Sequence, residues 1–462
     1  MSPSLAAILT VGFVLVLFGR DRLNEAKVSP ALWLPVMWMA ITGSRFISQW
    51  ISLGVSGPVT ADGPEGSPLD ALYFLLLILA GLWVLGRRHA AIGAIVRNNR
   101  WLVAFFVYSF FAILWSDFPF IAFKRWIKTL GHPVMALIIL TDPNPIGALR
   151  IVMKRCAYLL IPFSVLLIKY FPEYGRGFDA YSGQPVNNGV GLTKNDLGYQ
   201  CMIFGLFFLW NLMTAGRAGT RRVRRWEITL STVFLGLIAW LLWRANSATS
   251  LAALVLGVVM MLVMGTVNRR LVGVWVVAGV ALVAGAELTF DLHTSLLDLV
   301  GRDPTLTDRT KVWADVLALQ DSPILGTGFE SFWLGSRIEA LWAKWWWHPN
   351  QAHNGYIETY LNLGIIGVLL LACVLVSTFR KIARQALVDF DFARFRLAVL
   401  FAIVAFNFTE ASFKGVHLLW TMFYIIAIDY PRSRARQAHR SRTSSAQPSS
   451  HGPSPSAARR LP

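Results

Sequence analysis

The sequence predicts an all-α polytopic integral membrane protein with about 12–13 transmembrane helices and one large loop outside the membrane. Of its 462 residues, 55% are hydrophobic and 15% are charged, whereas soluble domains carry about 25% charged residues. Long apolar runs recur along the chain, and about 20 largely apolar residues cross a bilayer. Helices are expected because every backbone polar group inside lipid must be satisfied within the protein.

Thirteen apolar runs are candidate spans, and some are short enough to be tilted or re-entrant. They are 3–18, 31–50 (which contains Arg45), 69–85, 102–115, 128–140, 156–170, 197–213, 228–243, 250–267, 271–287, 356–378, 397–411 and 417–429. Residues 1–430 therefore form one predicted transmembrane domain. The remainder, 431–462, is rich in Arg, Ser, Pro and Ala and is predicted to be a disordered, basic cytoplasmic tail.

The basic residues alternate along the chain and indicate its orientation. Of the 43 Lys and Arg residues, 29 lie in alternate loops beginning with 19–30 and in the tail, and 13 lie in the intervening loops. Because cytoplasmic loops carry the excess of Lys and Arg, we expect the N-terminus outside and the C-terminus inside. The net charge of +18 is then mostly a topology signal, and nucleic acid is not an expected partner.

The longest interruption is the predicted periplasmic loop 288–355. Thr307 or Asp308 can cap a helix that runs to about Gln320, and the stretch 321–323, which ends in Pro323, terminates this helix. A second amphipathic helix is expected from about Phe329, with one face formed by Phe332, Trp333, Leu341, Trp342 and Trp345. Aromatic residues favour the headgroup level, so membrane anchoring is the favoured role of these rings. Stacking on sugars is the alternative.

The densest polar cluster beside a span is 348–358, HPNQAHNGYIE. A neutral imidazole can take a proton from a sugar hydroxyl, which is general-base work. We therefore single out His353 as the candidate catalytic residue, although it could equally cap the following helix. Asn354 and Glu358 from the same cluster are candidate substrate-binding residues, and Glu358 could instead orient His353.

These motifs resemble the O-antigen ligase and polymerase superfamily, and the pattern is closest to exopolysaccharide polymerases. The resemblance rests on QAHNGYIETYL at 351–361 followed by GIIG at 364–367, on RTKVW at 309–313, and on PILGTG at 323–328. Looser matches are WSDFP at 115–119 and KNDLG at 194–198. One departure is Ala248, which stands where many ligases carry an arginine; Arg244 could substitute, and the departure favours a polymerase.

The resemblance implies a metal-independent, inverting glycosyl transfer with no cofactor. The donor would be a glycan on undecaprenyl pyrophosphate, and the acceptor another lipid-linked glycan in a polymerase or lipid A core in a ligase. His353 corresponds to the family's loop histidine and Arg309 to its loop arginine. The implied location is the bacterial inner membrane, with the active face in the periplasm. Membrane lipid, and possible export or chain-length proteins, complete the expected partners.

A pyrophosphate leaving group needs positive charge, which arginine can supply bidentately. The candidate cations, in order of preference, are Arg309, Arg244, Lys194, Arg125 and Arg176. Each of these taken singly is more often a solvated or headgroup-facing residue. Two further residues, Glu410 and Lys414, are expected to pair with each other in the last periplasmic hairpin.

No aspartates stand in metal-ligand spacing, so no metal site is predicted. The competing class is a transporter of the same lipid-linked glycan. It would require charged residues deep in several spans, and the predicted spans are nearly free of charge. A structural scaffold for polysaccharide export is a third possibility.

Overall fold

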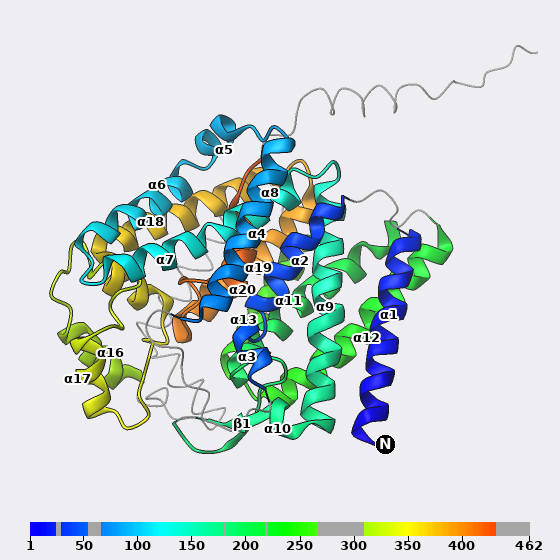
Figure 1. The fold of residues 1–462 in the computed structure, drawn as a ribbon. Helices are drawn as coiled ribbons and strands as arrows, with labels where there is room; N and C mark the ends of the chain where they lie inside the picture. The colour runs from blue at the N-terminus through cyan, green and yellow to red at the C-terminus, as the bar shows by residue number, and fades with distance from the viewer. Residues whose placement is uncertain (25–28, 54–65, 180, 218–219, 267–308, 431–462) are drawn as a thin grey trace, which may run out of the picture.

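The structure, a computed structural model, describes the chain except residues 25–28, 54–65, 180, 218–219, 267–308 and 431–462 (Figure 1). The described part is almost entirely helical. Its α-helices are α1 (Pro3–Asn24), α2 (Trp33–Thr42), α3 (Ile47–Ile51), α4 (Pro68–Arg87), α5 (Ile92–Asn98), α6 (Arg100–Phe111), α7 (Pro119–Thr129), α8 (Gly131–Leu140), α9 (Pro145–Tyr170), α10 (Pro172–Gly175), α11 (Lys194–Thr214), α12 (Arg221–Ala245), α13 (Ala248–Thr266), α16 (Arg309–Ala318), α17 (Ser336–Lys344), α18 (Gly355–Gln385), α19 (Phe390–Thr409) and α20 (Leu418–Ala427). Short 3-10 helices are η1 (Pro30–Leu32), η2 (Ala112–Trp115) and η3 (Ala215–Arg217), and β1 (Arg176–Phe178) pairs antiparallel with β2 (Pro185–Asn187).

Eight of the described helices are long and apolar enough to cross a membrane, namely α1, α4, α9, α11, α12, α13, α18 and α19. Three shorter apolar segments, 30–42, 100–115 and 418–427, add to them. The predicted class, an all-α polytopic membrane protein, is confirmed. The predicted count of 12–13 spans stays a prediction, because the run 271–287 lies outside the described residues.

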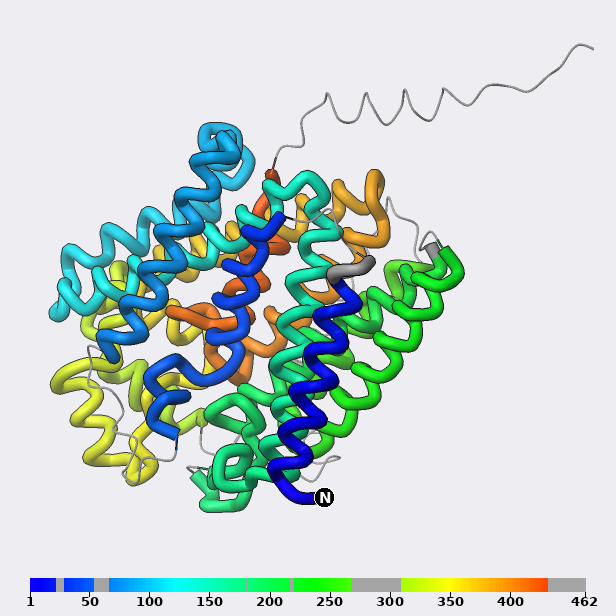
Figure 2. The backbone as a smooth tube through the Cα atoms, turned by 45° about the vertical axis from the view of Figure 1, so that its right-hand side comes forward, coloured from blue at the N-terminus to red at the C-terminus, as the bar shows by residue number. Residues whose placement is uncertain are grey.

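The centre of the bundle is formed by α9 and α11, the most buried of the spanning helices (Figure 2). Helix α9 packs against α1 and α2, and α11 packs against α12 and α13. In the outer helices α1, α4, α12 and α13, most residues are not buried within the protein. This is the pattern expected of helices that face lipid rather than water.

Helix α20 is too short to cross the bilayer, since its 10 residues rise about 15 Å against a hydrocarbon thickness of about 30 Å. All of its residues are buried, and it packs against α8. His132 of α8 bridges Thr421 at 2.7 Å and the carbonyl of Gly415 at 2.8 Å. The segment 410–417 therefore leads from the end of α19 back into the protein before α20 begins.

The last carbonyls of α20 are capped by cations from neighbouring helices. Lys381 Nζ donates to the carbonyl of Ala427 at 3.0 Å, and the Arg396 guanidinium donates to the carbonyl of Ile426. Helix C-termini leave their final carbonyls unsatisfied and carry a partial negative charge. These two cations therefore stabilise the buried end of α20.

Helix α18 is broken at Gly364, and the motif at 323–328 fills the break. Gly364 has φ +61°, and a Cβ there would lie 2.2 Å from the carbonyl oxygen of Ile324. Thr327 N donates to Leu361 O at 3.0 Å, and Gly328 N donates to Asn362 O at 3.0 Å. These bonds satisfy carbonyls that the break frees. The outer loop is thereby fixed to the membrane helix.

Helices α16 and α17 form a small unit at the end of the bundle where the N-terminus, α10 and β1 also lie (Figure 1). Its core is Val312, Val316, Phe332, Leu341, Ala352 and Leu361. The predicted helix from Thr307 or Asp308 is confirmed as α16, although its predicted cap lies outside the described residues. The predicted start of the second helix at Phe329 is wrong. Phe332 N donates to Asn362 Oδ1 at 3.1 Å, which folds 329–335 onto α18, so that α17 begins only after Gly335 at φ +60°.

The predicted span 31–50 is two helices, because the chain leaves helical geometry between Thr42 and Ile47. Arg45 lies in this break rather than within a span, and it is 7% exposed. Its Nη2 donates to the carbonyl of Tyr174 at 2.5 Å. Arg45 therefore joins the break to the segment that follows α9. The predicted tail 431–462 lies outside the described residues.

Candidate active site

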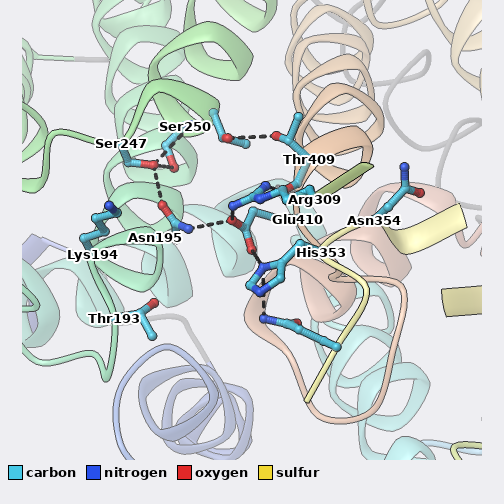
Figure 3. A network of polar contacts seen from close by, with 12 residues as sticks. Thr193, Lys194, Asn195, Ser247, Ser250, Arg309, His353, Asn354, Thr409 and Glu410 are labelled. Carbon is cyan, nitrogen blue, oxygen red and sulfur yellow. Dashed lines mark hydrogen bonds and ion pairs between the residues drawn. The ribbon is translucent and has the colours of Figure 1, made fainter. Parts of the chain in front are cut away.

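His353, the main candidate from the sequence, lies in a polar cluster centred on Glu410 (Figure 3). The Nδ1 atom of His353 is 3.1 Å from Glu410 Oε2. Glu410 Oε1 accepts hydrogen bonds from Arg309 Nη2 at 2.8 Å and from Asn195 Nδ2 at 2.5 Å. The four residues come from the start of α11, the start of α16, the loop before α18 and the end of α19. The fold thus converges a histidine, a carboxylate, an arginine and an amide on one point.

Glu410 holds a buried negative charge. It is 5% exposed, and burial alone would raise its pKa. The charges and hydrogen bonds of His353 and Arg309 outweigh that burial and lower the pKa of Glu410 to about 2. An ionised carboxylate only accepts hydrogen bonds. In the neutral form of His353, Glu410 therefore keeps the single imidazole proton on Nδ1, which leaves the lone pair on Nε2. The Gln351 amide lies 3.4 Å from Nδ1, a longer and uncharged contact that the carboxylate outcompetes.

The backbone before His353 is held by two hydrogen bonds to Ala352, one at its carbonyl and one at its N–H. Trp313 Nε1 donates to the carbonyl of Ala352 at 2.7 Å, and Glu358 Oε1 accepts from Ala352 N at 2.6 Å. His353 itself has φ +49°, in the left-handed region, which costs an ordinary residue about 1–2 kcal/mol. The bonds on Ala352 and the contact with Glu410 offset that cost. His353 is therefore presented in a fixed orientation.

Asn354 begins α18 and docks it against α19. Its Oδ1 accepts from the N–H groups two and three residues on, at 2.9 and 3.1 Å, and its Nδ2 donates to the carbonyl of Phe408 at 3.0 Å. At the next position, a Cβ on Gly355 would lie 2.1 Å from Asn407 Oδ1, so only glycine allows this close approach. Asn354 is therefore a helix cap, and its predicted role in substrate binding stays a prediction.

Glu358 is 3% exposed and lies one helical turn into α18. Its carboxylate accepts from Trp333 Nε1 at 3.0 Å as well as from Ala352 N at 2.6 Å. These bonds orient the backbone before His353, while the carboxylate that contacts the His353 ring is that of Glu410. The substrate-binding role expected of Glu358 stays a prediction.

The side of the cluster formed by α11 and α13 contributes polar groups that the sequence did not single out. Thr193 and Asp196 form a reciprocal capping box at the start of α11, which fixes Asn195 between them. Ser247 Oγ donates to Asn195 Oδ1 at 2.9 Å, and Ser250 lies 3.1 Å beyond Ser247 (Figure 3). Asn195 is thus oriented with its amide nitrogen toward Glu410.

Lys194 links the β-hairpin to the start of α11. Its Nζ forms an ion pair with Asp179 Oδ2 at 2.6 Å. Asp179 also accepts from Tyr181 N at 3.2 Å and Ser182 N at 3.0 Å, which builds the turn of the hairpin. Burial would raise the pKa of Asp179, but the bonds from Lys194 and Ser182 lower it to about 2. The hairpin turn is therefore tied to the site at neutral pH.

The other predicted cations lie on separate elements. Arg244 ends α12 and contacts Asn187 of β2, with Asn187 Nδ2 donating to the Arg244 carbonyl at 2.9 Å. Arg176 Nε donates to the carbonyl of Ile168 at 3.0 Å, and Arg125 of α7 donates to the carbonyl of Glu330. Of the predicted cations, Arg309 is the one that contacts Glu410 in the described structure. Substrate binding by the others stays a prediction.

The expected pair between Glu410 and Lys414 is wrong. Lys414 Nζ donates to Gln351 Oε1 at 2.6 Å, while Glu410 pairs with Arg309 and His353. Glu410 and Lys414 are close in sequence, but the Glu410 carboxylate is instead paired with three donors from distant elements. A sequence signal for Glu410 existed, since it is a single carboxylate in a short loop between apolar spans, and ionisable groups there are usually functional.

In the part of the chain that the structure describes, no group of three or more His, Cys, Asp or Glu side chains is placed to hold a metal ion. Metal independence itself stays a prediction, because it concerns activity rather than geometry.

Fold and site together define a multi-pass membrane protein with a histidine–carboxylate–arginine cluster at one end of its helices. Residues 231–372, which include Arg309 and His353, match a family model described as O-antigen ligase. The chain is also 29% identical over 299 residues to the exopolysaccharide production protein ExoQ of Rhizobium meliloti (strain 1021). That alignment covers 60% of this chain and 64% of the relative, less than two thirds of its length. These matches confirm the resemblance to the O-antigen ligase and polymerase superfamily.

Proposed function

We propose that this chain is a membrane glycosyltransferase that polymerises undecaprenyl-pyrophosphate-linked repeat units into an exopolysaccharide or O-antigen-type polysaccharide. The observation that carries the proposal is the contact of His353 and Arg309 with one buried carboxylate, Glu410. It places a general base beside a cation, which is what transfer from a pyrophosphate donor requires. The family match and the name of the relative support the substrate class.

In the proposed step, His353 Nε2 takes the proton of an acceptor hydroxyl. The hydroxyl oxygen forms a bond to the anomeric carbon of the donor, on the face opposite the pyrophosphate. The bond from that carbon to the pyrophosphate oxygen breaks, and undecaprenyl pyrophosphate leaves with the electron pair. Attack from the opposite face inverts the anomeric configuration. His353 then passes its proton to water.

Arg309 supports the leaving group in this scheme. Two of its N–H groups are engaged, one by Glu410 Oε1 and one by the carbonyl of Thr409. A guanidinium has five N–H donors, and the described residues leave the other three for pyrophosphate oxygens. Glu410 offsets part of the positive charge of Arg309. The predicted cations would supply further positive charge to the pyrophosphate; they are Arg244, Lys194, Arg125 and Arg176. The step uses these side chains and no metal ion.

The proposed location is the bacterial inner membrane, with the site at the periplasmic face and the C-terminus in the cytoplasm. The charge asymmetry of the loops supports this orientation. A ligase that transfers the same lipid-linked glycan to lipid A core is the second candidate, favoured by the description of the matching family. The two differ in acceptor, and both use the same base and donor.

The test is an assay with purified protein and lipid-linked repeat units as the sole substrate, resolved by product length. A ladder of longer lipid-linked glycans that is lost in His353→Ala supports the polymerase. Transfer only after lipid A core is added supports the ligase. If neither product forms, or if normally expressed His353→Ala keeps full activity, the proposed chemistry is wrong.

A further inference from the structure

A strip of aromatic rings leads directly to His353. We define it as Tyr181 from the hairpin turn and Trp345 and Trp347 from the loop after α17. The Trp347 ring centroid is 6.3 Å from that of His353, 6.2 Å from that of Tyr181 and 6.2 Å from that of Trp345. All three rings are half-buried. The strip therefore offers partly accessible aromatic surface next to the proposed base.

The strip is rigidly built from two separate parts of the chain. Trp345 Nε1 donates to Asp315 Oδ2 of α16 at 2.8 Å, which ties the loop after α17 to its own unit. Tyr181 is carried by the turn that Asp179 organises, and Lys194 ties that turn to the start of α11 at 2.6 Å. Rings ordered in this way lose little conformational entropy when a ligand binds.

One polar atom of the strip has no partner among the described residues. The indole Nε1 of Trp347 is buried and lacks a hydrogen-bond acceptor in the described part of the chain. A buried indole N–H usually finds a partner, and leaving it unpaired is costly. The donor lies on the ring that contacts His353, where the proposed acceptor hydroxyl would arrive. Because Nε1 is covered in this structure, a rotation of the Trp347 ring would bring it to an oxygen of a bound molecule.

The geometry points to the strip as the subsite that holds the acceptor glycan, with a sugar face packed on the rings and a sugar oxygen accepting from Trp347 Nε1. A pyranose ring has an apolar C–H face and hydroxyls at its edge, which matches an aromatic ring with one polar handle. This inference rests on the proposed function, which supplies the glycan. It also separates the roles of adjacent tryptophans, because Trp346 is 71% exposed and suits membrane anchoring.

The test is binding rather than turnover. Lipid-free fragments, made by mild acid hydrolysis of the surface polysaccharide of the source cell, are titrated against full-length His353→Ala protein in detergent. Saturation-transfer NMR and calorimetry report contact and Kd. We expect Trp347→Leu to weaken binding about tenfold or more, and Trp347→Phe, which keeps the ring but loses one hydrogen bond, about threefold to tenfold.

Two further variants guard against misfolding and against the anchoring alternative. Tyr181→Ala lies outside the unit formed by α16 and α17 and should still weaken binding. Trp346→Leu, the matched neighbour, should bind like its parent. Unchanged binding in both Trp347→Leu and Tyr181→Ala, or weakening by Trp346→Leu alone, overturns the inference. Full polymerising activity of His353→Ala would instead refute the proposed chemistry while leaving the binding result intact.

Discussion

Replacing Glu410 by Gln tests whether the carboxylate sets the proton position on His353. The side chain keeps its shape but loses its charge, and it gains an amide that can donate. Three donors now converge on Glu410, at 2.5 Å from Asn195, 2.8 Å from Arg309 and 3.1 Å from His353. Asn195 and Arg309 will keep the one remaining acceptor oxygen, so the new amide will face His353 Nδ1. An imidazole that accepts at Nδ1 must carry its proton on Nε2.

The magnitude follows from that change of tautomer. Loss of one charge-assisted hydrogen bond costs about 1.5–3 kcal/mol, or roughly 10-fold to 150-fold in rate. Glu410→Gln also removes the base function of His353, and this enlarges the expected loss of rate, because general-base catalysis contributes about 10²–10⁴-fold to the rate. We therefore expect Glu410→Gln to lower kcat by about 10²–10³-fold with little change in KM.

The assay is formation of the glycan ladder by purified protein at matched expression. Glu410→Asp retains the charge and should recover part of the activity. Residues that act as a unit are non-additive, so the double variant His353→Ala with Glu410→Gln should be no slower than His353→Ala alone. If Glu410→Gln keeps more than about a third of wild-type kcat, or if the two losses multiply, Glu410 does not act through His353.

Three further predictions concern stability and cofactors. Gly364→Ala should lower the melting temperature, because a Cβ there would lie 2.2 Å from the Ile324 carbonyl oxygen at φ +61°, whereas Gly236→Ala, with nothing within 4 Å, should not. The pKa of Glu410 falls from 4.5 to about 2 on folding, so its contribution of about 3 kcal/mol is present above pH 4.5 and is lost as pH falls toward 2. Thermal unfolding in detergent should therefore lose more stability between pH 5 and pH 2 in wild type than in Glu410→Gln, and equal losses would contradict this assignment. A chelator should leave ladder formation unchanged, and restoration of a chelator-sensitive activity by added metal would show that a metal takes part.

The class, an all-α membrane protein, could be predicted from the sequence because a helix that crosses a bilayer needs about 20 largely apolar residues. Apolar runs with few or no charges indicate the helices directly, as in α4 and α13. The breaks could not be predicted in the same way. Arg45 in the break between α2 and α3 and Gly364 in α18 lie inside runs that remain apolar on both sides. Their conformation depends on partners, such as the 323–328 turn, that are distant in sequence.

The sequence singled out members of the candidate cluster where they stand in one motif, and it did not single out the members that only tertiary packing brings to the cluster. His353 and Arg309 stand in recognisable stretches of the outer loop. Glu410 stands out as a single carboxylate after an apolar helix, but no local pattern identifies its partners, and its neighbour Lys414 is a nearer but wrong partner. Asn195 is positioned by two features that are distant in sequence. The capping box fixes it at the start of α11, and Ser247 in the turn before α13 donates to its side chain. Pairings of this kind depend on tertiary packing, which composition and spacing do not encode.

The turn that fills the break in α18 also limits how the site can move. Thr327 and Gly328 donate to the carbonyls of Leu361 and Asn362, which are both buried residues. Swinging this turn away would therefore leave buried backbone groups without partners. Hydrogen bonds of this kind hold the turn in one position and oppose its opening and closing. In the proposed polymerisation, the growing glycan would therefore pass a surface that the 323–328 turn holds in place.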